Sequence, residues 1–155
     1  MRIGDSMEDL LDCATCETST TSNYDEIIIF ARYLKPRREQ YSAALCMVFF
    51  KIRTWNNRVG LLSLNVIEEC INQIGRTFLN VLFTNIYLNE IIKIIHPTYD
   101  GNSCTGDVRI KIIQLLHVWA RKYPEYPKIE KVYNQLVITG VVKESDLIVS
   151  TASHF

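Results

Sequence analysis

Two cysteines, Cys13 and Cys16, have the CxxC spacing that zinc-binding and redox-active sites use. A zinc site needs a second pair or two nearby histidines, but Cys46, Cys70 and Cys104 are isolated and the histidines form no motif. A redox pair usually joins a strand to a helix, whereas this pair ends an amphipathic helical pattern. We therefore predict no metal, no cofactor and cysteines that stay reduced.

His117 is the second group that could do chemistry, because an imidazole can act as a general base. No Ser or Cys nucleophile motif accompanies it, and the carboxylates of Asp107 and Glu90 stand equally alone. The glycines form no phosphate-binding pattern. We predict that the chain has no catalytic residues and is not an enzyme.

Basic side chains gather at one corner between two predicted helices: Arg32, Lys35, Arg37 and Arg38. A second group consists of Lys51, Arg53 and Arg58. The simpler interpretation is a solvated, charged loop. The functional alternative is binding to anionic lipid head groups, where each Lys or Arg near the surface contributes about 1 kcal/mol. Residues 1–17 are acidic apart from Arg2, so we expect no basic amphipathic helix that inserts deeply into lipid.

Composition narrows the class of protein further. The 17 basic and 17 acidic residues balance, so the chain lacks the basic charge typical of nucleic-acid-binding proteins. The longest apolar run is residues 43–50, whereas a membrane-spanning helix needs about 18 residues. Residues 1–21 lack the apolar centre of a secretory signal. We predict one cytosolic domain, because 155 residues suffice to bury a core.

Helical periodicity supplies the elements that position these residues. The segment 107–123 carries Val108, Ile112, Leu115 and Trp119 at spacings of four, three and four, which places them on one face. Neighbouring apolar residues widen this face, so we expect the helix to be covered on several sides and to act as a spine. The same pattern predicts seven other helices, over residues 6–16, 25–34, 38–53, 58–74, 76–83, 87–95 and 128–139.

The ends of several helices are marked by capping residues. Ser6 is the expected N-cap of the first helix, with Asp9 in a capping-box position, and Asn23 is the expected cap of the second. Gly75 and Gly140 end later helices. Short connections favour antiparallel neighbours, and the few β-branched runs are too sparse for a sheet. We predict an all-α fold, a right-handed superhelix of about eight helices.

Ordered similarities to one family run through most of these helices. They comprise residues 6–15 (SMEDLLDCAT), 64–70 (LNVIEEC), 87–95 (YLNEIIKII), 111–119 (KIIQLLHVW) and 140–142 (GVV), with Gly75, Arg76, Phe78, Pro97, Tyr99, Pro124, Lys128, Ile129, Val132 and Tyr133. On these residues the chain resembles a VHS domain, an α-solenoid of the ENTH/VHS type found at the N-terminus of sorting adaptors. It is most similar to the Golgi-localised, gamma-ear-containing, Arf-binding adaptors. The resemblance implies one domain over residues 5–146 and a C-terminal tail over 147–155.

The resemblance implies a module without catalytic activity that binds short peptide signals or ubiquitin on membrane cargo. In the Golgi adaptors, an acidic-cluster dileucine peptide lies between the sixth and eighth helices. Carried over by position, the peptide-binding residues are Asn85, Ile86, Asn89, Ile92, Tyr99, Leu136 and Val137. Apolar pockets for two leucines, flanked by polar groups that fix the peptide backbone, would suit such a site.

This sequence departs from the family where the peptide's acidic cluster would bind. Thr84, Ile86 and Val137 stand at positions where the family pattern has Lys or Arg. Each charge-assisted hydrogen bond lost there is worth about 1.5–3 kcal/mol. We therefore predict weak or no binding of the acidic dileucine signal. The groove then binds a more apolar peptide or forms part of the core.

The resemblance also implies a ubiquitin-binding site on the second and fourth helices. Tyr24 stands at the aromatic position, where Trp is usual, and Leu61 and Ser63 lie at or near the fourth-helix contact. A Tyr ring can supply a flat apolar contact. The simpler interpretation is that Tyr24 packs at the start of its helix. We expect any affinity to be weak because the patch is small.

The sequence thus predicts a non-enzymatic cargo-recognition module of vesicle-mediated protein transport. We expect it to be cytoplasmic and peripheral at Golgi or endosomal membranes. Its predicted partners are sorting-signal peptides, with ubiquitin and anionic lipid head groups as further candidates and no nucleic acid. Two alternatives remain. One is a membrane-binding helical module that uses both basic groups, Arg32, Lys35, Arg37 and Arg38 together with Lys51, Arg53 and Arg58, to bind phosphoinositides or other anionic lipids. The other is a scaffold domain that binds another protein's tail.

Overall fold

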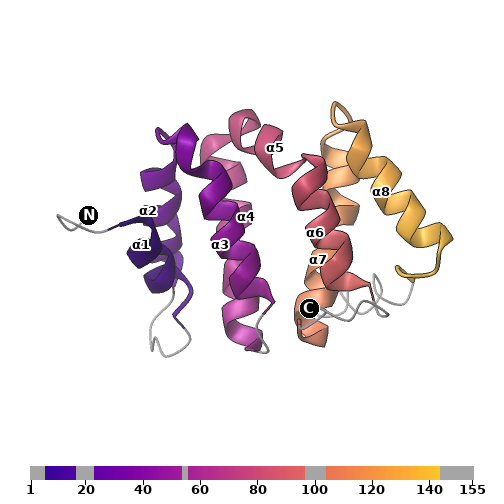
Figure 1. Ribbon diagram of the computed structural model, residues 1–155, viewed down its shortest axis with the longest axis horizontal. Helices are drawn as coiled ribbons and strands as arrows, with labels where there is room; N and C mark the ends of the chain where they lie inside the picture. Colours follow the sequence, from indigo (N-terminus) through magenta and orange to yellow (C-terminus); the bar gives the residue numbers. More distant parts are fainter. Residues whose placement is uncertain (1–5, 17–22, 54–55, 97–103, 144–155) are drawn as a thin grey trace. The chain divides into compact units, whose positions relative to one another are not determined.

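All regular secondary structure in the described part of the chain is helical. The structure, a computed structural model, describes residues 6–16, 23–53, 56–96 and 104–143. Within these ranges there are eight α-helices, one short 3-10 helix and no strand (Figure 1). The prediction of an all-α chain with about eight helices is confirmed. The helices form two compact units that divide between Leu82 and Phe83.

The first unit contains five α-helices. They are α1 (Met7–Ala14), α2 (Tyr24–Leu34), α3 (Tyr41–Ile52), α4 (Asn57–Ile74) and α5 (Arg76–Leu82). The central element is α4, which packs against α2, α3 and α5. Its buried residues lie around most of its circumference, from Leu62 and Leu64 to Ile67 and Cys70, as its nearly continuous apolar pattern predicts.

Local signals fix the ends of these helices. The Ser6 hydroxyl accepts a hydrogen bond from the Asp9 backbone amide at 3.2 Å, and the Asp9 carboxylate accepts one from the Ser6 amide at 3.4 Å, so the predicted capping box is confirmed. Gly75 follows α4 with φ +86°, a conformation that side chains with a Cβ rarely adopt. The predicted helix 38–53 is divided: Arg38–Gln40 form a 3-10 turn before α3 begins at Tyr41.

The second unit contains α6 (Asn85–Ile95), α7 (Gly106–Lys122) and α8 (Pro127–Ile138). The predicted spine is α7, which packs against both α6 and α8. The Arg109 guanidinium donates hydrogen bonds to the carbonyl oxygen of Ile95 at 3.0 Å and to that of Val141 at 2.7 Å. Arg109 therefore ties the end of α6 and the segment after α8 to α7.

An aromatic cluster closes the opposite end of this second unit. The ring of Phe83 lies 5.6 Å from Trp119, 6.1 Å from Tyr123 and 5.1 Å from Tyr126, measured between ring centroids. Such tilted and edge-to-face pairs add to the stabilisation from burial alone. Trp119 therefore supports the fold, in keeping with the prediction that α7 is a spine.

In the described part of the chain, no single helix is long and apolar enough to cross a membrane. Only α5 and α6, taken together across the break between them, reach that length and composition.

Candidate functional site

An open hollow lies between α2 and α4 of the first unit. It has a volume of about 510 Å³ and is lined by Asn23, Tyr24, Ile27, Arg58, Leu62, Asn65, Glu68, Glu69 and Asn72. Tyr24 opens α2 and is 60% exposed, so most of its ring is available at the rim. Apolar contacts from Ile27 and Leu62 combine with charged and amide groups. This mixture is typical of a site that binds a partner through one aromatic contact and several polar ones.

Asn23 holds one edge of this hollow in place. It precedes α2 but makes no side-chain capping bond to that helix. Instead its buried amide nitrogen donates to the carbonyl oxygens of Ala14 and Cys16, each at 3.2 Å, at the end of α1. Its amide oxygen accepts a hydrogen bond from Arg58 at 3.1 Å. The predicted cap thus serves α1, because the neighbouring helix offers carbonyl groups that no longer have partners within α1.

The structure brings only part of the predicted ubiquitin-binding set to this surface. Ser63 is 0% exposed, and its hydroxyl donates to the carbonyl oxygen of Val59 at 2.7 Å, which directs the side chain into the core. Leu61 is half-buried and does not line the hollow. Leu62, which the sequence analysis did not select, lies there instead. Apolar residues surround α4, so periodicity alone could not show which leucine faces Tyr24.

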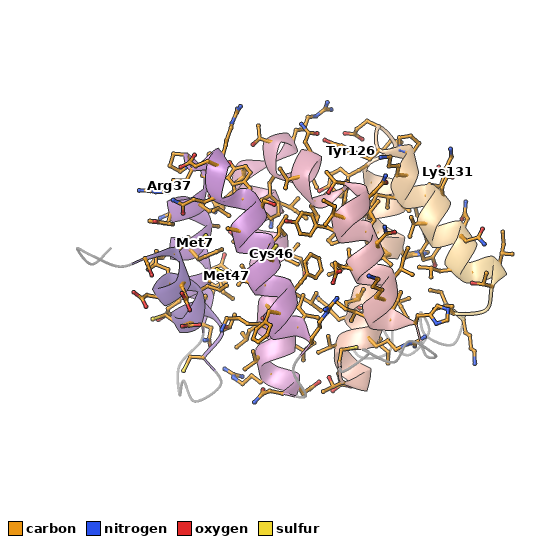
Figure 2. All side chains as sticks on the ribbon, in the orientation of Figure 1. Met7, Arg37, Cys46, Met47, Tyr126 and Lys131 are labelled. Atoms are coloured by element: carbon orange, nitrogen blue, oxygen red, sulfur yellow. The ribbon has the colours of Figure 1, made fainter. Side chains whose placement is uncertain are left out.

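The predicted lipid-binding cluster is divided in the structure. Arg32, Lys35 and Arg38 are exposed and line a shallow hollow of about 760 Å³, together with Pro36, Glu39 and Gln73. Arg37 lies elsewhere: its guanidinium sits 3.9 Å from the centroid of the Tyr33 ring and donates to the Tyr33 carbonyl oxygen at 2.5 Å (Figure 2). Three of the four basic residues therefore line one surface, whereas Arg37, which follows α2, is held against Tyr33 in the last turns of that helix.

Six of the seven predicted peptide-binding residues belong to α6 and α8, and they differ in exposure. Asn85, Asn89 and Ile86 are exposed, the last at 70%, and Ile92 is half-buried. Leu136 is buried against the core, whereas Val137 is 46% exposed. Tyr99 lies outside the described residues. The surface is therefore partly open and apolar.

Ile86 and Val137 lie at opposite ends of this surface. α6 and α8 run in the same direction, because α7 connects them as an antiparallel neighbour (Figure 1). Ile86 is in the first turn of α6 and Val137 in the last turn of α8. Helices of 11 and 12 residues are about 17 Å long, so a peptide would need at least about five extended residues to contact both side chains.

Positive charge is sparse along this surface. The basic residue of α6, Lys93, lies seven positions after Ile86, about 10 Å along the helix axis, and its ammonium is 4.0 Å from the Glu90 carboxylate. The basic residues of α8, Lys128 and Lys131, precede Val137 by nine and six positions, about 14 Å and about 9 Å along the helix axis. At such distances charges are largely screened at physiological salt.

His117 makes two structural hydrogen bonds. Its Nδ1 accepts a hydrogen bond from the Arg121 guanidinium at 2.7 Å, and the Tyr133 hydroxyl lies 2.9 Å from the same nitrogen, linking α7 to α8. Burial, reinforced by the positive charge of Arg121, lowers the pKa of His117 below its ordinary value. A neutral imidazole fits this role, because only an unprotonated Nδ1 can accept a hydrogen bond from the guanidinium.

The five cysteines differ in burial, and two of them, Cys70 and Cys104, are buried. Burial raises the pKa of the Cys70 and Cys104 thiols, which disfavours the reactive thiolate. Within the described ranges, no group of three or more His, Cys, Asp or Glu side chains has the geometry to hold a metal ion. The CxxC pair stands at the end of α1, with Cys13 exposed and Cys16 half-buried.

Comparisons with known proteins agree with this architecture. The VHS domain family profile matches residues 1–140. The chain is 31% identical over 140 residues to ADP-ribosylation factor-binding protein GGA3 from Homo sapiens, and 29% identical over 139 residues to ADP-ribosylation factor-binding protein GGA2 from Homo sapiens. These alignments cover 90% of this chain but only 19% and 23% of the relatives, so the chain spans about a fifth of their length.

A solved structure shows the same fold. The VHS and FYVE tandem domains of Hrs, a protein involved in membrane trafficking and signal transduction, superpose with a TM-score of 0.76 at 18% identity. The match covers 90% of this chain and 63% of the Hrs chain. The predicted fold class and the predicted family resemblance are both confirmed: the chain belongs to the VHS domain family.

Proposed function

We propose that the chain is a non-enzymatic recognition module in membrane trafficking that binds ubiquitin, and short apolar sorting peptides, on membrane cargo. The observation that carries this proposal is the exposed Tyr24 ring at the mouth of the α2–α4 hollow. An exposed aromatic ring next to buried aliphatic side chains can dock against a small apolar patch of a folded partner. The trafficking role rests on the family and on its GGA and Hrs relatives.

Ubiquitin binding is tested by titrating unlabelled ubiquitin into the isotope-labelled chain and following its amide resonances. We expect progressive shifts around Tyr24, Ile27 and Leu62, with weak affinity because the contact is small. Asn72 lies on α4 at the far end of the same hollow and should shift less. Shifts that spare Tyr24 and its neighbours would contradict the ubiquitin proposal.

The α6–α8 surface supports a second ligand, an extended apolar peptide. Ile86 and Val137 supply two apolar contacts, and the exposed amides of Asn85 and Asn89 can fix the peptide backbone. The scarcity of positive charge beside them disfavours an acidic peptide. Calorimetric titration with a dileucine peptide, with and without its acidic cluster, tests this. Micromolar affinity that depends on the acidic cluster would contradict it.

A different candidate function is favoured by the hollow that Arg32, Lys35 and Arg38 line. Three cations at one exposed surface attract anionic head groups, and phosphoinositides offer several negative charges to one such site. Co-sedimentation with liposomes that contain or lack phosphoinositides tests this function. Binding that requires the phosphoinositide and is lost in Arg32→Gln/Lys35→Gln, but kept in Arg37→Gln, would support it. Equal sedimentation of all three proteins would reject it.

A further inference from the structure

A third surface, on α1 and α3, has no part in the function proposed above. Residues 43–50 form the longest apolar run of the chain, and they lie within α3. Ala44, Leu45, Val48 and Phe49 are buried on the inner side of that helix. Phe50, in contrast, is 75% exposed on the outer side. A helix that is apolar around most of its circumference normally has its outer side covered as well.

The exposed side of α3 borders a small hollow shared with α1. The hollow has a volume of about 310 Å³ and is lined by Glu8, Asp12, Cys46, Met47, Phe50 and Lys51. Cys46 and Phe50 are one turn apart on α3, and Glu8 and Asp12 are one turn apart on α1, so each pair forms one wall. Figure 2 shows Met7 on α1, with Cys46 and Met47 on α3. Methionine side chains adapt readily to different apolar partners.

The two carboxylates at the rim of the hollow differ in whether they form an ion pair. The Lys51 ammonium donates to the Asp12 carboxylate at 2.7 Å, which fixes the lysine stem along the wall and neutralises Asp12. Glu8 is exposed one turn earlier and makes no ion pair among the described residues. Among the described residues, the rim therefore keeps one carboxylate without an ion-pair partner beside an apolar floor.

We propose that this α1–α3 surface binds a short amphipathic segment of another protein, with a large apolar residue in the hollow and a Lys or Arg about one helical turn away against Glu8. A volume near 300 Å³ is at the lower end of ligand pockets and suits one or two side chains of a peptide. The negative charge of Glu8 favours a peptide with a basic residue at this position over one with an acidic residue. The proposal does not depend on the α2–α4 hollow or on the α6–α8 surface.

The test begins with a random 12-residue peptide library displayed on phage, selected on the wild-type chain and counter-selected on Phe50→Ala. Phe50 is solvent-exposed, so its replacement should leave the fold intact, which circular dichroism checks. We expect enriched peptides in which an aromatic or aliphatic residue stands three or four positions from Lys or Arg. Failure to enrich peptides, or enrichment without the basic residue, would overturn the proposal.

Affinities of one synthetic peptide from the selection then test each part of the surface. By fluorescence anisotropy, we expect Phe50→Ala to weaken binding about tenfold or more, and Glu8→Gln by about two- to fivefold. The matched control is Ile138→Ala, an equally exposed apolar residue on α8, which should change nothing. A peptide whose Lys or Arg is replaced by Glu should bind more weakly to wild type and recover on Glu8→Lys. Equal binding of both peptides to wild type would overturn the proposal, and so would a chain dimer in sedimentation that Phe50→Ala dissolves.

Discussion

The α2–α4 hollow and the α6–α8 surface both expose apolar side chains, but their polar surroundings differ. At the α2–α4 hollow, Tyr24 stands among Arg58, Glu68 and Glu69, which provide charges of both signs. At the α6–α8 surface, Ile86 and Val137 are flanked by amides, and the nearest basic group of α6 is 4.0 Å from a carboxylate. The first surface can therefore discriminate partners by charge, and the second mainly by apolar shape.

The two surfaces also differ in the interactions that stabilise them. Asn23 and Arg58 fix the edge of the α2–α4 hollow by hydrogen bonds that reach the end of α1. The α6–α8 surface depends on packing against α7 and on the two hydrogen bonds of Arg109. Polar replacements should consequently disturb the first surface most, and apolar truncations the second.

The largest difference in stability is expected between substitutions at two adjacent residues of α8, one buried and one exposed. Leu136→Ala removes a buried side chain and should lower the free energy of unfolding by about 2–5 kcal/mol. Val137→Ala, at the exposed neighbour, should change it by no more than about 0.5 kcal/mol. Urea unfolding followed by circular dichroism measures both. Equal losses would mean that Val137 belongs to the core and that the surface is not open there.

A second prediction adds the charge that the α6–α8 surface lacks. Ile86→Lys combined with Val137→Arg should strengthen binding of an acidic-cluster dileucine peptide by about tenfold or more, since charge-assisted hydrogen bonds contribute about 1.5–3 kcal/mol each. Calorimetry measures the change. Ile138→Arg, which adds a charge to α8 one residue after Val137, serves as the control. An unchanged affinity in the double variant would contradict the electrostatic explanation.

A third prediction concerns the edge of the α2–α4 hollow. Asn23→Ala leaves the carbonyls of Ala14 and Cys16 and the Arg58 guanidinium without these partners, so stability should fall by about 1–3 kcal/mol. Amide hydrogen exchange should accelerate in α1 and at the start of α2. Asn65→Ala, at an exposed asparagine of the same hollow, should cost far less. Similar losses in both variants would show that Asn23 has no special role.

The smallest effect is expected in the pH dependence of stability, to which His117 contributes. Burial and Arg121 lower its pKa in the folded chain, so the unfolded chain takes up a proton first as the pH falls through about 6.5. The free energy of unfolding should therefore decrease as the pH falls from 7 towards the lowered pKa of His117 in the folded chain. His117→Gln should give a flatter profile over that interval in urea unfolding at several pH values. If stability depends on pH in the same way in the wild type and in His117→Gln, the lowered pKa of His117 is contradicted.

How much of this could be predicted from the sequence depends on which interactions are local. The eight helices, the Ser6–Asp9 capping box and the glycine after α4 follow from short-range patterns and are confirmed. Asn23 stands at the predicted N-cap position of α2, but the expected side-chain capping bond is absent there, because its amide is directed at the end of the preceding helix. That choice depends on where α1 ends in space, which spacing along the chain does not specify.

The site residues were harder to predict for the same reason. On α4, apolar residues occur on nearly every side, so the pattern does not show that Leu62 faces the hollow while Ser63 is buried. In the sequence, Arg37 cannot be distinguished from its basic neighbours. In the structure, its guanidinium packs over the ring of Tyr33, four residues earlier. The helices and the family could be read from the sequence, whereas the exposed face of each helix required the packing of its neighbours.

The central claim is that the chain has two separate recognition surfaces with different ligands. A crossed titration tests it most directly: wild type, Tyr24→Ala and Ile86→Asp are each titrated with ubiquitin and with a dileucine peptide that lacks an acidic cluster. We predict that Tyr24→Ala weakens ubiquitin binding about tenfold and leaves the peptide affinity unchanged. Ile86→Asp should do the reverse. If either variant weakens both ligands equally, or neither weakens any, the account of two separate surfaces is wrong.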